Sequence, residues 1–206
     1  MMIREVTPLA NSDEIKKVFL CGKVFSAAAP INTMQLFKGR KEQLQSVISA
    51  VTARGKHIVL FGDRGVGKTS LANILKDAMA TIGSIEVVKV NCNESDNYLD
   101  LWRRILTNIS VIAETPDDSE QLVNVEYSLD QWLETYPKVG SGEIKRILNV
   151  KCNESHELVL IFDEFDRLSK ECRAKFADTI KDLSDSSTNA TITLIGVATN
   201  LTELIG

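Results

Sequence analysis

The sequence is poor in the residue types that build several common kinds of active site. Only two histidines, His57 and His156, occur in 206 residues, which argues against a histidine-based triad or a multi-histidine metal site. Four scattered cysteines never form the C-x-x-C spacing of a zinc site, so we expect reduced, mostly buried thiols. No apolar run approaches the length of a membrane span, and the N-terminus lacks the apolar core of a signal peptide. We therefore expect a cytoplasmic protein with no membrane partner.

Composition and charge indicate one globular domain with an uneven charge distribution. The chain is 44% hydrophobic and 25% charged, and its length suits a single large α/β domain. Residues 1–56 carry nine Lys and Arg against four Asp and Glu, whereas residues 57–206 carry fifteen against twenty-four. A basic N-terminal flank can contact nucleic acid, although an ordinary solvated surface explains the same charge more simply.

A glycine-rich turn follows a strand-like apolar run at residues 57–61 and fits the pattern G-x-x-x-x-G-K-[ST]. A helix is predicted next, because apolar side chains recur on one face through Met79. A strand, a glycine-rich turn and a helix are the context that a phosphate-binding loop requires. The predicted binding residues are Gly62, Asp63, Arg64, Gly65, Val66, Gly67, Lys68, Thr69 and Ser70.

Each position of this pattern has a chemical role. Glycines allow successive backbone N–H groups to curl around an anion, and the helix that follows directs its free N–H groups to the same place. Lys68 supplies a mobile positive charge for the β- and γ-phosphates. The Thr69 hydroxyl is a ligand for Mg²⁺. These residues predict a nucleoside triphosphate and Mg²⁺ as cofactors.

A second motif supplies carboxylates. The apolar run Leu158–Phe162 is typical of a buried parallel strand, and Asp163 and Glu164 follow it directly. We expect Asp163 to face the Mg²⁺ held by Thr69, and Glu164 to polarise the attacking water as the catalytic residue. The alternative is that both acids cap the next helix. The sequence lacks the N-K-x-D motif by which GTPases read guanine, which favours ATP.

A glutamate directly after the strand aspartate marks the P-loop class with an extra strand between the P-loop strand and the acidic strand. We expect residues 191–198 to form that strand, in a parallel three-layer α-β-α sheet. Thr199 and Asn200 would then lie beside the γ-phosphate, where one of them detects it or helps in catalysis. A simple turn at these two residues is the alternative.

The remaining elements are predicted from periodicity. We expect a strand at 85–90, a helix after it capped by Ser95 or Asp96, and one amphipathic helix from Phe165 to Leu183. Apolar residues between 122 and 133 allow either a helix or an excursion of mixed secondary structure. Asp166 and Arg167 are expected to be surface or cap residues. We divide the chain into a lead-in at 1–36 and a nucleotide-binding core at 37–206, with a variable insertion at 111–150.

With both motifs the chain resembles the AAA+ ATPases, and within them the branch of origin-recognition initiators and STAND switches. The segment Phe37–Glu42 is similar to the F-x-G-R-x-x-E segment of that branch, and Ile195–Thr199 is similar to its sensor-1 strand. The resemblance implies that residues 24–32, with Pro30, pack near adenine. It also implies a lid and an arginine finger after sensor 1, whereas this sequence ends six residues after Asn200.

From this resemblance we expect either a truncated form of a longer protein or dependence on another chain, as a homo-oligomer or with a second protein that supplies the arginine. The expected function is Mg²⁺-dependent ATP hydrolysis coupled to conformational change or assembly with a partner. Two alternatives stay open at this point. One is a STAND-type switch in signalling or anti-phage defence, with little turnover. The other is an initiator-like ATPase that loads onto DNA.

Overall fold

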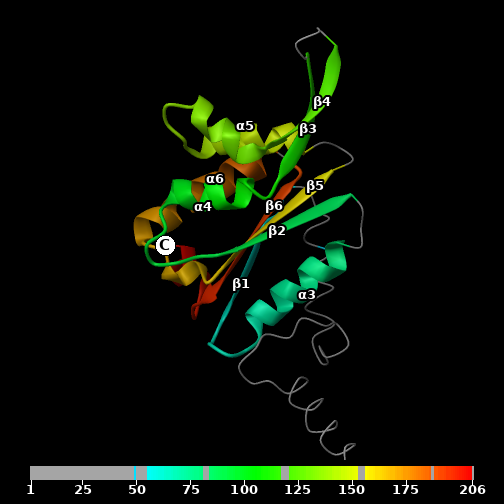
Figure 1. The fold of residues 1–206 in the computed structure, drawn as a ribbon. Coiled ribbons are helices and arrows are strands. Elements are labelled where there is room, and N and C mark those ends of the chain that lie inside the picture. Colours follow the sequence, from blue (N-terminus) through cyan, green and yellow to red (C-terminus); the bar gives the residue numbers. More distant parts are fainter. Residues whose placement is uncertain are drawn as a thin grey trace, which may run out of the picture.

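The computed structural model describes residues 49, 55–80, 84–116, 121–152, 156–186 and 188–205. The predictions for the lead-in 1–36, Pro30 and the Phe37–Glu42 segment lie outside these residues. The described elements, shown in Figure 1, are in chain order β1 (Ile58–Gly62), α3 (Lys68–Ala80), β2 (Ile85–Asn91), α4 (Tyr98–Leu106), β3 (Ser110–Pro116), β4 (Leu122–Ser128), η2 (Leu129–Thr135), α5 (Ser141–Lys151), β5 (Glu157–Asp163), η3 (Phe165–Arg167), α6 (Lys170–Asp185), β6 (Ala190–Val197) and α7 (Leu201–Ile205).

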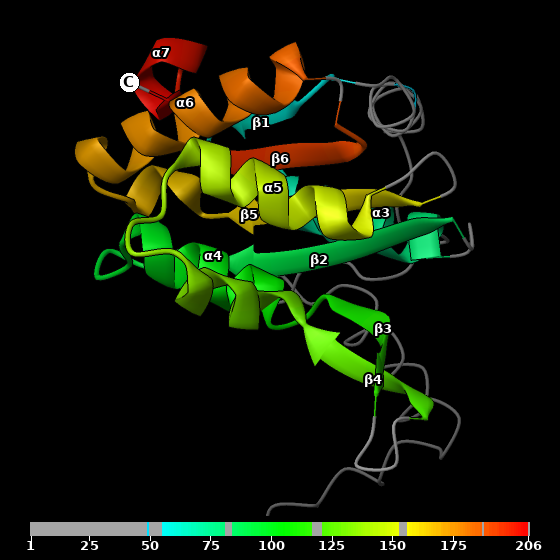
Figure 2. The same ribbon diagram turned by 90° about the horizontal axis from the view of Figure 1, so that it is seen from above.

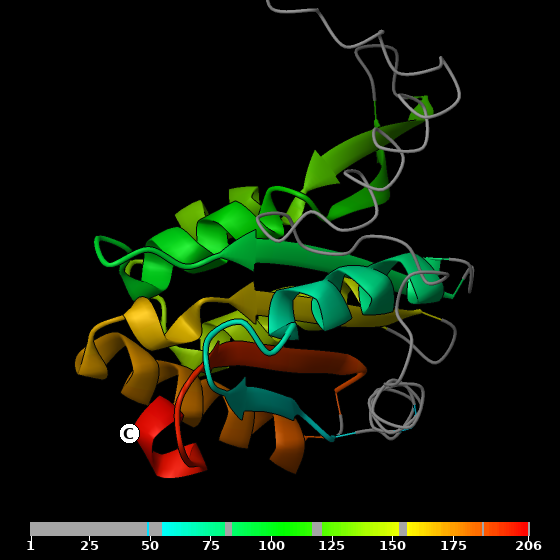
Figure 3. The same ribbon diagram turned by 90° about the horizontal axis from the view of Figure 1, so that it is seen from below.

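Four parallel strands form the main sheet in the order β1-β6-β5-β2. The strand predicted at 191–198 is β6, and it pairs with β1 on one side and β5 on the other, for example through Leu60 opposite Ile195 and Leu160 opposite Ile192. Figure 3 shows β6 between β1 and β5. The predicted α/β fold with an extra strand between the P-loop strand and the acidic strand is therefore confirmed.

Helices cover both faces of this sheet, because alternate residues of each buried strand point to opposite faces. On β5, Val159 and Ile161 pack with the apolar face of α3, whereas Leu160 and Phe162 pack with α4, α5 and α6. Figures 2 and 3 show the two helical layers from above and from below. The result is the three-layer α-β-α arrangement that the sequence predicts.

An aromatic cluster fills the layer between the sheet and helices α4 and α6. Phe176 of α6 is fully buried, and four aromatic rings lie around it with ring centroids 4.8 to 5.7 Å away. Two of these rings, Phe162 and Phe165, flank Asp163 and Glu164 in the sequence, and the other two are Tyr98 and Trp102. The cluster therefore holds the end of the acidic strand in place from the side opposite α3.

Of the two alternatives left open for residues 122–133, the structure has the mixed one, whereas the predicted cap of α4 is wrong. Strands β3 and β4 pair antiparallel, with Val111 opposite Tyr127. A helix begins only at Leu129, and it is a short 3₁₀ helix. The cap of α4 is Asn97, whose side chain accepts a hydrogen bond from the Asp100 N–H, and neither Ser95 nor Asp96 has this role.

The predicted helix from Phe165 to Leu183 is divided in two. Ser169 has extended backbone angles, and its hydroxyl accepts a hydrogen bond from the Cys172 N–H, so α6 begins only at Lys170. The residues before it form the short helix η3, which carries Phe165.

The described cysteines are free thiols, as expected. Burial raises the pKa of Cys172 to about 11 and that of Cys152 to about 12, and it raises the pKa of Cys92 further. These thiols are therefore uncharged and poor nucleophiles near neutral pH. Among the described helices, none is both long and apolar enough to cross a membrane.

Candidate functional site

The turn between β1 and α3 has the backbone that its glycines predict. Gly62, Gly65 and Gly67 have φ angles of 147°, 83° and 83°, which side chains rarely adopt. A Cβ at Gly65 would meet nothing within 4 Å, so the backbone angle, and not crowding, requires glycine there. Between these glycines the chain exposes Asp63, Arg64 and Val66. The turn therefore presents accessible backbone next to the start of a helix.

The Lys68 side chain lies over this turn. Its ammonium donates hydrogen bonds of 2.8 Å to the carbonyl oxygens of Gly62 and Asp63. The lysine is the first residue of α3, so its charge lies beside the free N–H groups of that helix. Helix N–H groups, a helix dipole and an ammonium together form a site for an anion.

The structure brings Thr69 and Asp163 together across 94 positions of sequence. The Thr69 hydroxyl lies 3.4 Å from Asp163 Oδ1. Asp163 is only 2% exposed at the end of β5, and the same oxygen accepts a hydrogen bond of 3.0 Å from the Glu164 N–H. Two hard oxygen donors thus converge next to this glycine-rich turn.

The donor set suits Mg²⁺. Magnesium is commonly held by one or two protein oxygens, with phosphate oxygens and water completing its coordination. Within the described parts of the chain, no group of three or more His, Cys, Asp or Glu is placed to hold a metal by itself. Thr69 and Asp163 therefore fit a cation that arrives with a nucleotide better than a cation held by the protein alone.

A lysine beside Asp163 is absent from the sequence-based predictions. Lys89 of β2 places its ammonium 2.9 Å from Asp163 Oδ2 and donates a hydrogen bond of 2.8 Å to Asn73 Oδ1 of α3. The sequence does contain a signal for this contact, because Lys89 lies inside an apolar strand. It follows Val87 by two residues, so both side chains point to the face of the sheet that α3 covers. The strand order places that lysine beside the acidic strand.

Glu164 occupies an unusual backbone position directly after Asp163. Its φ of 58° makes it the non-glycine residue with a positive φ among those described, which points to a position held by its surroundings. Its carboxylate is about half exposed and lies 3.2 Å from the Arg167 guanidinium. The alternative was that both acids cap the next helix. Glu164 does precede the short helix η3, but its side chain makes no capping hydrogen bond there, and α6 is capped by Ser169.

Asp166 has a role that the sequence did not indicate. Its Oδ1 accepts a hydrogen bond of 2.8 Å from the Val197 N–H at the end of β6. This bond joins the turn after the acidic strand to the strand that leads to Thr199. Arg167 is exposed, as predicted for a surface residue.

Thr199 and Asn200 are exposed and are hydrogen-bonded to the first turn of α7. The N–H and hydroxyl of Thr199 both donate to Glu203 Oε2 at 2.7 Å, and Asn200 Oδ1 accepts from the Glu203 N–H at 2.9 Å. The two hydrogen bonds that Thr199 donates hold the pKa of Glu203 below its usual value, so this carboxylate stays charged. In this structure both candidate sensors therefore take part in a helix cap.

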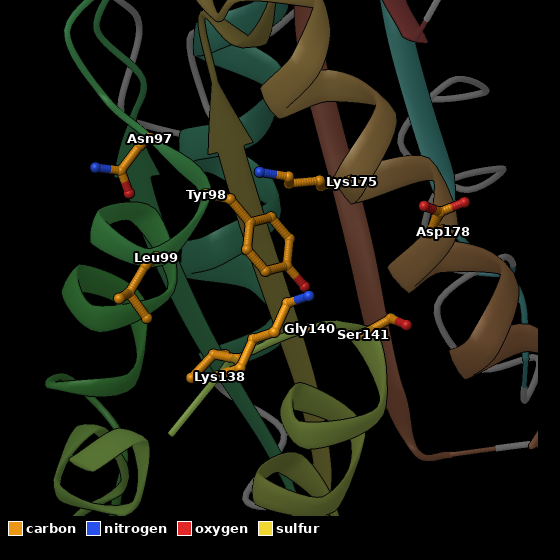
Figure 4. Close-up of a pocket in the computed structure, with 9 residues that line it drawn as sticks. Asn97, Tyr98, Leu99, Lys138, Gly140, Ser141, Lys175 and Asp178 are labelled. Atoms are coloured by element: carbon orange, nitrogen blue, oxygen red, sulfur yellow. The ribbon is translucent and has the colours of Figure 1, made fainter. Parts of the chain in front are cut away.

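A cavity of about 430 Å³ lies on the opposite side of the sheet, between α4, α5 and α6. Figure 4 shows Tyr98 of α4 and Lys175 of α6 on neighbouring sides of it, with Lys138 below. The Tyr98 hydroxyl is hydrogen-bonded to Thr179, and burial raises the Tyr98 pKa to about 12. None of the predicted phosphate, metal or sensor residues lines this cavity.

Together the fold and this site define a P-loop nucleotide-binding protein of the class with an extra central strand. The model of the AAA domain family matches residues 51–205, and the chain belongs to that family. The resemblance to AAA+ ATPases is thereby confirmed.

Two solved structures share the fold. The Walker-type ATPase PABY2304 of Pyrococcus abyssi is 17% identical with a TM-score of 0.50, and the match covers 82% of this chain and 48% of that chain. A chain of Drosophila ORC bound to DNA is 16% identical with a TM-score of 0.50, and the match covers 80% and 39%. This chain thus spans less than half the length of either structure.

One short stretch is closer in sequence to a curated protein. Over 72 residues the chain is 35% identical to a protein of Brucella suis biovar 1 that is described as an ABC transporter ATP-binding protein. The match covers 34% of this chain and 28% of that protein.

Proposed function

We propose that this protein binds ATP with Mg²⁺ at the turn Gly62–Ser70 and hydrolyses it, and that hydrolysis changes its conformation or its assembly with a partner. The observation that carries the proposal is the 3.4 Å approach of the Thr69 hydroxyl to Asp163, beside the phosphate-binding turn. A turn that bound no phosphate would not need a buried acid at its helix start. Membership of the AAA domain family supports the same activity.

Each residue has a distinct part in the proposed reaction. The backbone N–H groups of the turn and the Lys68 ammonium bind the phosphates, after Lys68 leaves the two carbonyl oxygens that it now contacts. Thr69 and Asp163 would hold Mg²⁺, which neutralises charge on the β- and γ-phosphates. Glu164 accepts a hydrogen bond from the attacking water and orients it toward the γ-phosphate.

Nucleotide binding tests the first half of the proposal. We expect a fluorescent ATP analogue to bind in the presence of Mg²⁺, and ATP to displace it better than GTP does. Lys68→Ala should weaken binding by about tenfold or more, because a charge-assisted contact to phosphate is lost. Lys76→Ala is a matched control, since Lys76 is an exposed lysine two turns further along α3. Equal binding by Lys68→Ala and by the control would contradict the assignment.

A nucleotide switch with little turnover is the second candidate function. The observation that favours it is the ion pair of Glu164 with Arg167, because a water must compete with the guanidinium for the same carboxylate. Measuring ATP turnover and the nucleotide that copurifies with the protein separates the two candidates. Steady multiple turnover supports the hydrolase, and bound nucleotide with almost no turnover supports the switch.

We also propose that full turnover needs an arginine from a neighbouring chain, which the resemblance to AAA+ proteins implies. Such an arginine contributes about 10³–10⁵ in rate in related phosphoryl-transfer enzymes. The rate per chain should then rise with protein concentration or on addition of the partner. A constant low rate over a hundredfold range of concentration, with no partner effect, would argue against it.

Three expectations stay predictions. Pro30 and its contact with adenine lie outside the described residues, as does most of the basic flank, residues 1–56, on which nucleic-acid binding would depend. One of Thr199 and Asn200 is still proposed to detect the γ-phosphate, and this requires its hydrogen bonds with Glu203 to change when nucleotide binds.

A further inference from the structure

The buried carboxylate of Asp163 has two oxygens with different neighbours. Oδ1 lies beside the Thr69 hydroxyl and accepts the Glu164 N–H, so it is the oxygen that faces the phosphate-binding turn. Oδ2 lies 2.9 Å from the ammonium of Lys89. The Lys89 side chain is 13% exposed, and that of Asp163 is 3% exposed, so water screens the pair poorly.

Lys89 reaches this position because of the order of the strands and the alternation of side chains along β2. β2 and β5 are paired in parallel, with Lys89 opposite Ile161 and Asn91 opposite Asp163. Lys89 and Asp163 both point to the α3 side of the sheet, where Asn73 of α3 accepts a hydrogen bond from the same ammonium. The lysine therefore lies between the sheet and the helix that carries Thr69.

The orientation of Asp163 does not depend on this lysine. The carboxylate lies at the end of a strand that is buried from Leu158 onward, and it is held through Oδ1 by a backbone N–H and approached by a hydroxyl. What Lys89 adds is a positive charge. A buried carboxylate without a counter-charge is costly, and a cation at Oδ1 and an ammonium at Oδ2 repel each other.

We propose that Lys89 acts as a built-in counter-ion that neutralises Asp163 when Mg²⁺ is absent and competes with Mg²⁺ for the same carboxylate. This inference rests on the proposed role of Asp163 in holding Mg²⁺. Its consequence is that the nucleotide-free site has a low affinity for Mg²⁺, so that the cation enters with the nucleotide, whose phosphates supply the remaining negative charge. The charge of Lys89 thus sets how Mg²⁺ binding and ATP binding are coupled.

Replacing Lys89 by methionine removes the charge and keeps an unbranched side chain. We expect Lys89→Met to lower the melting temperature of the nucleotide-free protein in EDTA, because Asp163 loses its counter-charge. Mg²⁺ alone should then raise the melting temperature of the variant more than that of the wild type. The Mg²⁺ concentration for half-maximal binding of a fluorescent ATP analogue should fall by about tenfold.

Two variants separate charge from structure. Lys89→Arg keeps the positive charge and should retain the wild-type Mg²⁺ requirement. Lys76→Met removes an exposed lysine that lines the same surface cavity as Lys89, and it should leave that requirement unchanged. If Lys89→Met does not fold, Lys89→Gln provides the same measurement, since its amide can still donate to Asn73.

An unchanged or higher Mg²⁺ requirement in both neutral variants would overturn the inference, even if they melt at a lower temperature. Such a result would mean that the lysine only stabilises the fold. Failure of the wild type to bind ATP at any Mg²⁺ concentration would overturn the proposed function instead. The melting temperatures with Mg²⁺ alone would still decide whether Lys89 competes with the cation.

Discussion

The Asp166 carboxylate accepts a hydrogen bond of 2.8 Å from the Val197 N–H, and this bond connects the turn after the acidic strand to the end of β6. Gly196 permits the contact, because a Cβ there would lie 2.8 Å from Asp166 Oδ1 and 3.1 Å from the Asp166 backbone nitrogen. The residues proposed to orient water and to detect the γ-phosphate are therefore attached to one another through Asp166.

Asp166→Ala should reduce ATP turnover more than ATP binding. The change leaves the Val197 N–H without its partner and frees the end of β6 from the Glu164 turn, at a cost of about 1 kcal/mol in unfolding free energy. Turnover and affinity are measured in parallel on the same preparation. Asp166→Asn keeps an acceptor oxygen and should recover most of the lost turnover. Equal losses in the Ala and Asn variants would show that the hydrogen bond to Val197 is not the cause.

Glu164→Gln should preserve nucleotide binding and abolish most hydrolysis. The amide keeps the size of the side chain but is a far weaker acceptor for the proton of the attacking water, so we expect turnover to fall by about 10²–10³-fold. Filter binding of labelled ATP and release of phosphate report the two steps separately. Normal hydrolysis by this variant would show that another residue orients the water.

Phe176→Ala should be among the most destabilising single changes in the described core. The ring is fully buried against four other aromatic rings, and its removal leaves a cavity under Phe162 and Phe165. We expect a loss of about 3–5 kcal/mol in unfolding free energy, measured by urea denaturation. Phe176→Leu should cost clearly less, because it fills part of the space. A loss below about 1 kcal/mol for the Ala variant would mean that the cluster repacks.

The stability of the fold should depend on pH through His57. Burial lowers the pKa of this imidazole below its ordinary value of 6.5, and Nδ1 accepts a hydrogen bond of 3.0 Å from the Ile192 N–H. The folded protein thus takes up a proton less readily than the unfolded chain. Stability is complete above about pH 6.5 and is lost as the pH falls below that value toward the lower pKa of the folded state.

This pH dependence can be isolated with one substitution. Between pH 7.5 and pH 5.5 the wild type should lose up to about 1 kcal/mol of unfolding free energy through His57. His57→Asn offers an acceptor to the Ile192 N–H and does not titrate in this range, so its stability should change less over the same interval. Identical pH profiles for the two proteins in urea denaturation would exclude His57 as the source.

Local sequence patterns predicted the turns and strands that depend on residues close together in the sequence. The glycine-rich turn could be located because its positive φ angles need glycine, and the buried strand before Asp163 because it is a continuous apolar run. The order of the strands was predicted from Glu164 directly after Asp163. That prediction uses a rule known from P-loop proteins, and it does not follow from the physical chemistry of the two residues. Residues 122–133 were ambiguous because their apolar spacing fits a helix as well as a strand that ends in a 3₁₀ turn.

The sequence by itself determined the phosphate-binding turn, the acidic strand and the family, because each depends on residues within a few positions of one another. Only the tertiary structure decided that Lys89 and Asp166 take part in this site. The Lys89 ammonium comes from β2 and lies 2.9 Å from Asp163 Oδ2, and the hydrogen bond of Asp166 reaches the end of β6, 31 positions away. These contacts join separate strands, and nothing in the sequence around Lys89 or Asp166 indicates which group each will meet.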